Sequence, residues 1–332
     1  MGIEGRGRYS PTHLMVEPAG GDRIDKAQIE GCLTGHAIDF GRSSKMNSTE
    51  DRNIGWATSS EVDEADFSKL DSWDFNSVSL IYWREDRKVI DTAAKKRVIS
   101  SRIKAWLEEN NRQRCPATVK TEIKLSVDTE MALKAQVKAK IVEVAIHWDR
   151  RWAVISCQTD STVDVIIKLL NQTFKGAVAT FSRKRISDMV EGDADENFGV
   201  KLIEKLWNRL DQDGDLSIDG AAVELGSTAI LSSERGKTTI KGDLTREEIE
   251  AAAAAGGRKV FEALGIKLTR SERDFELTIL ADKLTMKDLV RPPFMGDSKE
   301  ADLLIGMDLY SEAHELVCSL ARWSIDNTSG EE

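Results

Sequence analysis

Residues 141–174 read IVEVAIHWDRRWAVISCQTDSTVDVIIKLLNQTF, and this stretch decides the predicted fold. Apolar and polar residues alternate through residues 142–146 and again through residues 152–156. A period of two is typical of strands that bury one face. The polar residues Asp149–Arg151 separate the two runs, so we predict an antiparallel hairpin of two strands.

The hydrophobic period changes directly after the predicted hairpin. Val163, Ile166 and Leu170 recur at helical spacing, and the preceding residues Asp160–Thr162 carry side-chain oxygens that can cap a helix N-terminus. We therefore expect a helix that covers one face of the hairpin.

The same pattern returns near the C-terminus. Phe261–Leu268 and Phe275–Leu280 form a second predicted hairpin around a polar turn at residues 270–273, and the short segment Lys283–Val290 follows it. The two stretches share too little sequence identity to indicate a duplication. Antiparallel hairpins that are each covered by helices make the chain an α+β protein with several subdomains.

Further strands and helices are predicted around these two units. Residues 40–61 are rich in Asn, Ser, Thr and Gly, so we expect a loop with little core there. The charged residues 84–88 are predicted to form a turn after a strand at residues 77–83, with Val89–Ile90 as the returning strand. The other strands are expected at residues 12–17, 177–181 and, in two short pieces, 227–242, and the other helices at residues 24–33, 93–110, 117–135, 200–210, 245–255 and 309–323.

These elements group into four predicted regions. Two amphipathic helices between strands form an excursion from the sheet, and this excursion is rich in basic residues. The regions are an N-terminal and central sheet region (residues 9–92 with 136–176), the basic two-helix excursion (93–135), a middle α+β region (177–247) and a C-terminal hairpin-plus-helix region (248–325).

The composition is that of an ordinary globular protein. The chain has 332 residues, of which 40% are hydrophobic and 31% are charged, so it can bury a sizeable core. No apolar run approaches the roughly 18–20 residues of a membrane-spanning helix, and the N-terminus lacks the apolar core of a signal peptide. The four cysteines are scattered without a CxxC pair, which favours reduced thiols in the cytoplasm over disulfides or a zinc site.

Basic residues gather in one part of an otherwise acidic chain. The net charge of −10 argues by itself against a nucleic-acid partner. Between Arg84 and Lys124, however, twelve basic residues stand against six acidic ones. Such groups can contact phosphates without reading base sequence, although basic helix faces are often only solvated. Five of these basic residues are predicted to face solvent. They lie off the apolar stripe of their helix or in the linker that follows it: Lys95, Lys96, Arg102, Arg112 and Arg114.

No residue pattern in the chain indicates a catalytic centre. Residues Asp211–Asp219 resemble a calcium-binding loop, but Leu216 stands where the sharp turn needs Gly and Ala222 where the bidentate Glu belongs. The acidic cluster Glu191–Glu196 has no partner His or Lys at a defined spacing, and the four histidines lie far apart in the sequence. Nucleophile-elbow, P-loop and dinucleotide-binding motifs are absent. We therefore expect no enzyme activity, no metal site and no cofactor.

Several short motifs resemble the RdgC family of recombination-associated DNA-binding proteins. The first is Lys241–Ile249, KGDLTREEI, which is followed by Gly256–Gly257 and by an alternating strand. Each motif is weak alone, but their order along residues 12–322 resembles the order in the family. The other segments that resemble the family are Asn53–Trp56 (NIGW), Val89–Trp106, Thr118–Cys157, Phe275–Val290 (ending LTMKDLV) and Ala301–Leu309 (ADLLIGMDL).

The resemblance implies a ring-shaped homodimer whose basic central hole holds duplex DNA without sequence preference. It also implies a role in restraining the access of a recombinase to DNA. By this resemblance the DNA contacts fall on Lys241, on Arg258 or Lys259, and near the linker residues Arg112 and Arg114. The aromatic side chain that latches the family's ring would fall near Gln136, where this chain has no Phe, so the resemblance does not extend to the latch.

Together these observations predict a non-catalytic, sequence-independent duplex-DNA-binding protein of the cytoplasm and nucleoid. Its expected partners are double-stranded DNA, a second copy of the chain and a recombinase. We expect no association with a membrane. A metal-dependent exonuclease and an acidic protein-interaction scaffold without a DNA role are the alternatives. The predicted DNA-binding residues are Lys95, Lys96, Arg102, Arg112, Arg114, Lys241, Arg258 and Lys259.

Overall fold

The chain folds as an α+β protein with antiparallel sheets, as predicted, and it divides into two compact units. Unit 1 comprises Met1–Ile24, Asp74–Leu80 and Glu143–Glu332, and unit 2 comprises Asp25–Trp73 and Ile81–Val142. The computed structural model describes residues 3, 7–19, 25–48, 51–174, 178–184, 186–189, 197–213, 216–233, 236–242, 244–245, 247–249, 251, 260–282 and 284–326.

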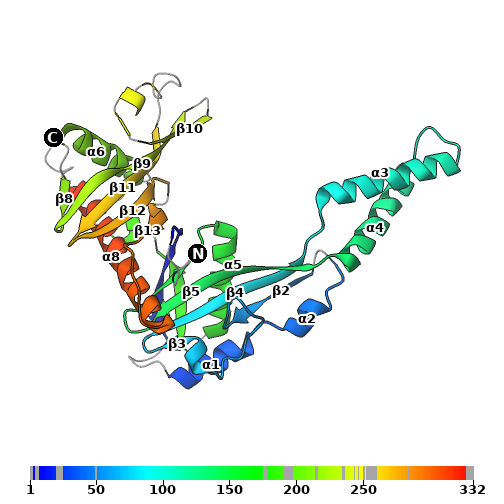
Figure 1. Ribbon diagram of the computed structural model, residues 1–332, viewed down its shortest axis with the longest axis horizontal. Coiled ribbons are helices and arrows are strands. Elements are labelled where there is room, and N and C mark those ends of the chain that lie inside the picture. The colour runs from blue at the N-terminus through cyan, green and yellow to red at the C-terminus, as the bar shows by residue number, and fades with distance from the viewer. Residues whose placement is uncertain are drawn as a thin grey trace. The chain divides into compact units, whose positions relative to one another are not determined.

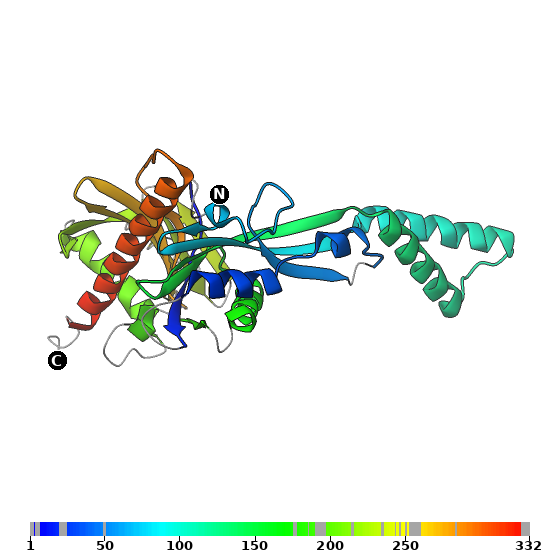
Figure 2. The same ribbon diagram turned by 90° about the horizontal axis from the view of Figure 1, so that it is seen from below.

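Unit 2 is built on three neighbouring strands and carries a helical hairpin. In the strand order, β2 is followed by β4 and then by β5, and β2 pairs antiparallel with β4. The start of β4 and the end of β5 belong to unit 1. Beyond the other ends of these two strands lie α3 and α4 (Figure 1, Figure 2). The elements are α1 (Lys26–Gly35), α2 (Phe40–Ser44), β2 (Arg52–Ala57), β4 (Val78–Lys88), α3 (Thr92–Glu109), α4 (Ala117–Lys134) and β5 (Val137–His147).

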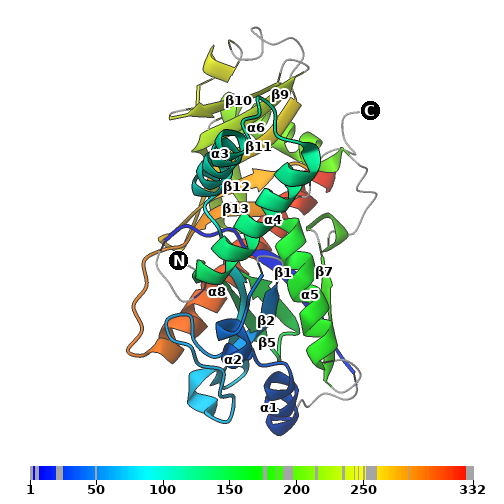
Figure 3. The ribbon, with the colours of Figure 1, turned by 90° about the vertical axis from the view of Figure 1, so that its right-hand side faces the viewer.

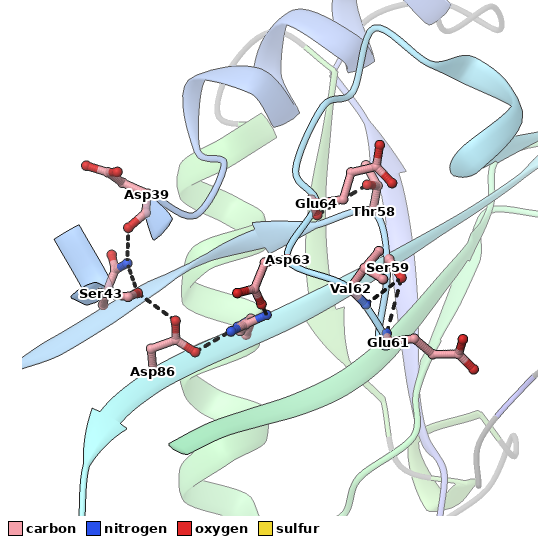
Figure 4. A network of polar contacts seen from close by, with 11 residues as sticks. Asp39, Ser43, Thr58, Ser59, Glu61, Val62, Asp63, Glu64 and Asp86 are labelled. Carbon is pink, nitrogen blue, oxygen red and sulfur yellow. Dashed lines mark hydrogen bonds and ion pairs between the residues drawn. The ribbon is translucent and has the colours of Figure 1, made fainter. Parts of the chain in front are cut away.

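Strand β4 continues through the charged residues 84–88, so the turn predicted there is wrong, and residues 89–90 form no returning strand. The strand can continue because its charged side chains have partners. Arg84 donates through Nε to Asp86 Oδ1 at 2.7 Å, and Asp86 Oδ2 accepts from Ser43 Oγ at 2.6 Å (Figure 4). Asp86 is fully buried in this network.

The loop predicted at residues 40–61 is also wrong, because α2 and β2 lie there. The polar residues of this stretch serve as internal partners. Asn53 of β2 is buried, and its side-chain amide donates to Ser43 Oγ at 2.8 Å and to the Asp39 carbonyl at 2.6 Å. Trp56 of the same strand is fully buried, so this stretch contributes to the core of unit 2.

Unit 1 contains the predicted central hairpin. β5 and β6 pair antiparallel from Val144–Ile155 to His147–Trp152, which confirms the prediction. β1 pairs with β6 and β7 pairs with β1, so this part of the sheet has the order β5-β6-β1-β7. Helix α5 is confirmed and lies against β7 (Figure 3). The elements are β1 (Thr12–Pro18), β3 (Asp74–Phe75, paired with the start of β4), β6 (Trp152–Ile155), α5 (Asp160–Phe174) and β7 (Ala179–Arg183).

The second predicted hairpin is confirmed in another sheet of unit 1, whose order is β10-β9-β11-β12-β13 with β8 beside β9. Strands β11 and β12 pair down to Arg270–Arg273, and the two turn residues Ser271 and Glu272 have positive φ, as a tight hairpin turn requires. The strands are β8 (Leu216–Ile218), β9 (Ala221–Ser233), β10 (Gly236–Lys241), β11 (Val260–Arg270), β12 (Arg273–Leu280) and β13 (Thr285–Val290).

Unit 1 also contains the helices α6 (Phe198–Asp213) and α8 (Lys299–Asp326), with a short 3-10 helix at Ile186–Met189. Helix α8 is longer than the predicted helix at residues 309–323, and acidic residues occupy its first turn, where they favour the helix N-terminus. Two further predictions, for Glu191–Glu196 and Gly256–Gly257, lie outside the described residues.

Candidate nucleic-acid interface

The hairpin of α3 and α4 has a defined beginning. Asp91 caps α3, because its Oδ1 accepts from the backbone N–H of Ala93 at 2.7 Å and of Ala94 at 3.2 Å. These bonds, that of Ala94 foremost, lower the pKa of the Asp91 carboxyl below its ordinary value. A charged Asp at this position fits the preference of helix N-termini for anions.

The turn between α3 and α4 holds two of the predicted contact residues. Asn111 has positive φ, and the backbone N–H of Arg112 donates to the Leu107 carbonyl at 3.0 Å. Pro116 precedes α4, where it offers no N–H that would need a partner. The backbone of the turn is therefore fixed, while the side chains of Arg112 and Arg114 are exposed.

Lys88 fastens the end of the hairpin to β4. Its Nζ donates to the carbonyl of Ala132 at 2.7 Å and to that of Leu133 at 3.3 Å. Both carbonyls lie in the last turn of α4, where a cation is favoured by the helix dipole. Lys88 is itself buried, so this cation has a structural role.

The two helices bury little apolar surface between them. Helix α3 has no buried residue, and α4 buries only Val127 and Ala132 among its described residues. Leu125 and Leu133 of α4 are 62% and 58% exposed. The hairpin therefore depends strongly on polar contacts between its helices.

Two predicted DNA contacts supply these polar contacts instead of facing solvent freely. Lys95 forms an ion pair with Asp128, and Arg102 forms one with Glu130. Arg102 also donates to Ser126 Oγ at 3.2 Å. Hydrogen bonds from Lys134 and Arg102 lower the pKa of Glu130. The prediction that Lys95 and Arg102 point freely to solvent is corrected, because each joins α3 to α4 with its side chain only 34% and 38% exposed.

The other predicted residues of the hairpin are exposed. Lys96, Arg112 and Arg114 have no carboxylate within ion-pair distance among the residues that the structure describes. Residues 92–134 hold ten basic side chains against five acidic ones, a net charge of +5, whereas the whole chain carries −10. Further exposed cations, which the predicted set omitted although they follow from the same basic run, are Arg97, Lys104, Lys120 and Lys124.

The remaining predicted contacts do not belong to the hairpin. Lys241 is exposed at the end of β10 in unit 1, where it pairs in register with Thr228 of β9. Its neighbour in the quoted motif, Thr245, accepts through Oγ1 from the Glu248 N–H at 3.3 Å, as predicted for a helix cap. Arg258 and Lys259 lie outside the described residues. The structure thus brings together Lys95, Lys96, Arg102, Arg112 and Arg114 on one hairpin.

A cluster of the half-buried His13 and the buried His314 in unit 1 was not predicted. The rings of His13 and His314 stack at 4.1 Å, and His13 Nδ1 lies 3.2 Å from the Tyr310 hydroxyl. Burial lowers the pKa of His314 to about 4, and burial followed by the charge of His314 places the pKa of His13 well below its ordinary value. Cys318 Sγ lies 3.9 Å from His314 Nδ1, but burial raises its pKa to about 11. His314 and Cys318 are therefore both neutral at pH 7, so this pair lacks the thiolate of an activated nucleophile.

The stretch Asp211–Asp219, which resembles a calcium-binding loop in sequence, does not form a single loop. Helix α6 extends through Asp213, and β8 begins at Leu216. In the part of the chain that the structure describes, no three His, Cys, Asp or Glu side chains are grouped so that they could hold a metal ion. Over the same residues, no helix combines the length and the hydrophobicity of a membrane span.

Comparison with known proteins adds no further evidence on the site. No model of a known protein family matches the chain, and a search of curated proteins finds no match. The candidate interface is therefore defined by its own geometry: a two-helix hairpin with a net positive charge and exposed cations, of which Lys96, Arg112 and Arg114 have no ion-pair partner among the described residues.

Proposed function

We propose that the chain binds duplex DNA without sequence preference, through phosphate contacts made by the α3–α4 hairpin. The observation that carries the proposal is the concentration of exposed cations on this hairpin, with a net charge of +5 in a chain of −10. Lysine and arginine side chains that contact phosphates give affinity and position but do not distinguish bases.

The cations of the hairpin divide into two roles in this proposal. Lys95 and Arg102 hold α3 against α4 through Asp128 and Glu130, so they shape the surface. The turn residues Arg112 and Arg114, with Lys96, have no ion-pair partner among the described residues and can contact phosphates, whereas Lys104 pairs with Glu108 on its own helix. The backbone hydrogen bond of Arg112 to the Leu107 carbonyl limits the freedom of the turn at that residue, which reduces the backbone entropy that is lost on binding.

A second copy of the chain and a role in DNA recombination belong to the same proposal. The resemblance to the RdgC family supports them, with DNA held in a dimer within the cytoplasm and recombinase access restrained. Sedimentation at several protein concentrations tests the dimer, and a monomer at all concentrations would remove it from the proposal.

Fluorescence anisotropy with two labelled duplexes of unrelated sequence tests the DNA binding. We expect equal affinities for both duplexes and strong loss of affinity when Arg112 and Arg114 are both changed to Glu. Changing the exposed Lys201 and Arg209 of α6 to Glu is the matched control and should have a small effect. Absence of binding at low salt would refute the proposal, and degradation of the duplex with Mg²⁺ or Mn²⁺ would favour the exonuclease alternative.

A further inference from the structure

Two arginines face each other across the sheet of unit 2. Arg52 of β2 and Arg87 of β4 are direct partners in the antiparallel register, so their side chains lie on the same face. Both are exposed. Like charges directly opposite each other destabilise a sheet, so this pair needs an explanation.

One carboxylate on this face offsets the repulsion only in part. Glu85 lies two residues before Arg87 on β4, hence on the same face, and it pairs with Arg52 at 3.3 Å. Its side chain is 10% exposed and is directed to Arg52. Arg87 has no carboxylate within ion-pair distance among the described residues.

Strand β5 adds two lysines to the same face. Lys140 Nζ lies over the ring of Trp83 at 5.8 Å, and Trp83 precedes Arg87 by four residues, so both side chains share that face of β4. Lys138 lies two residues before Lys140 and therefore points to the same side of β5. Both lysines are exposed.

On the opposite face of β4, the basic side chains have partners within the protein. Arg84 and Lys88 alternate with Arg87 and point to the other side. Arg84 binds Asp86 and Asp63 there (Figure 4), and Lys88 binds the end of α4. One face of the strand is therefore an internally paired network. On the other face, Glu85 pairs with Arg52, and Arg87, Lys138 and Lys140 lie beside this pair. We call Arg52, Arg87, Lys138 and Lys140 the sheet cation patch.

We propose that the sheet cation patch is a second phosphate-contact surface for the same duplex that the hairpin binds. This inference rests on the proposed function and deepens it by naming new contact residues. Three neighbouring strands place the cations within a width of about 10 Å, and Lys138 and Lys140 are separated by about 6.7 Å along their strand. Duplex DNA carries one charge per about 1.7 Å of its axis, so such a patch faces several phosphates.

The salt dependence of binding separates this inference from the proposed function. Each lost phosphate contact reduces the slope of log K against log salt by about 0.9. Arg87→Gln with Lys138→Gln should therefore reduce the slope by about 1.8, and so should Arg112→Gln with Arg114→Gln. The quadruple variant should show the sum if one duplex touches both surfaces, and Lys201→Gln with Arg209→Gln is the control.

Each outcome has a distinct meaning. An unchanged slope in the Arg87/Lys138 variant, with a reduced slope in the Arg112/Arg114 variant, would overturn the second surface and leave the proposed function standing. No DNA binding by the unaltered chain would overturn both, and an acidic protein would then be the candidate partner of the patch. Neutral glutamine at exposed positions should leave the fold intact, which circular dichroism and a thermal melt of each variant check.

Discussion

The buried network on β4 gives the sharpest stability prediction. Asp86 is fully buried and accepts hydrogen bonds from Arg84 and Ser43, at 2.7 and 2.6 Å. Changing Asp86 to Ala leaves the Arg84 guanidinium, 10% exposed, without its buried partner and leaves Ser43 without an acceptor. Breaking a buried ion pair from one side costs about 3–5 kcal/mol of unfolding free energy. Since Arg84 keeps its second partner, Asp63, we expect the lower end, about 3 kcal/mol.

A matched control is available at the same arginine. Asp63 pairs with Arg84 at 2.5 Å, but its side chain is 68% exposed, so changing Asp63 to Ala should cost less than about 1 kcal/mol. Urea unfolding followed by tryptophan fluorescence measures both variants, because Trp56 and Trp83 are buried in unit 2. Equal losses for the two variants, or a loss below about 1 kcal/mol for Asp86→Ala, would refute the reasoning.

Three further predictions follow from the same structure. Lys88→Met removes the cation at the end of α4 and should lower the free energy of unfolding by about 1–2 kcal/mol. Hydrogen exchange measures the effect, and the amides in the last turns of α4 should exchange faster. Lys95→Met breaks the ion pair with Asp128 and should cost up to about 1 kcal/mol, yet it should leave the salt dependence of DNA binding nearly unchanged; a clear drop in slope would contradict the structural role of Lys95. The pKa of His314 is lowered to about 4 in the folded chain, so the unfolded chain binds the proton first as pH falls, and stability should be full above the ordinary value near 6.5 and decline between there and about 4. His13, stacked on it, acts in the same direction, and thermal melts across this pH range, with His314→Gln as the variant that should flatten the decline, check the effect.

Local patterns were sufficient to predict the two hairpins and the helices α3, α4 and α5. In each case the signal lies within a short stretch: a period of two that changes to a helical period, or a polar turn between two apolar runs. The β5–β6 pairing and the β11–β12 pairing need no information from distant residues. The same holds for the exposure of Lys96, which follows from the phase of α3 alone.

The end of β4 could not be predicted in this way. A run of five charged residues has the composition of a turn, and its continuation as a strand depends on partners far away in the sequence. Asp63, Ser43 and the carbonyl of Ala132 supply them, and none of these is visible from residues 84–88 themselves. Sequence patterns detect charge but not the compensation that allows a charge to be buried.

The missed strand β2 has a similar cause. Its Gly55 has the appearance of a loop residue, but it is needed for close packing, because a Cβ there would lie 2.6 Å from Ile38 Cα. Its Asn53 appears to be a surface residue, yet it is a buried donor. Small and polar residues therefore mark a tight internal contact here, which propensity alone assigns to a loop.

The candidate site was predicted in part, and the reason for the limit is again tertiary. The basic run located the hairpin, but the pairing of Lys95 with Asp128 and of Arg102 with Glu130 depends on how α3 and α4 align. The contribution of Lys138 to one face with Arg87 depends on which strands are neighbours. These ion pairs and this shared face both depend on how separate elements pack. A sequence pattern within one element cannot predict that packing.

The most direct test of the central claim is the slope of log K against log salt for the intact chain and a duplex. If the six exposed cations of the hairpin without an ion-pair partner among the described residues (Lys96, Arg97, Arg112, Arg114, Lys120 and Lys124) each contact a phosphate, the slope is about −5.4, equal for duplexes of unrelated sequence. A slope near zero, or binding that depends on one sequence and not on salt, would contradict the account.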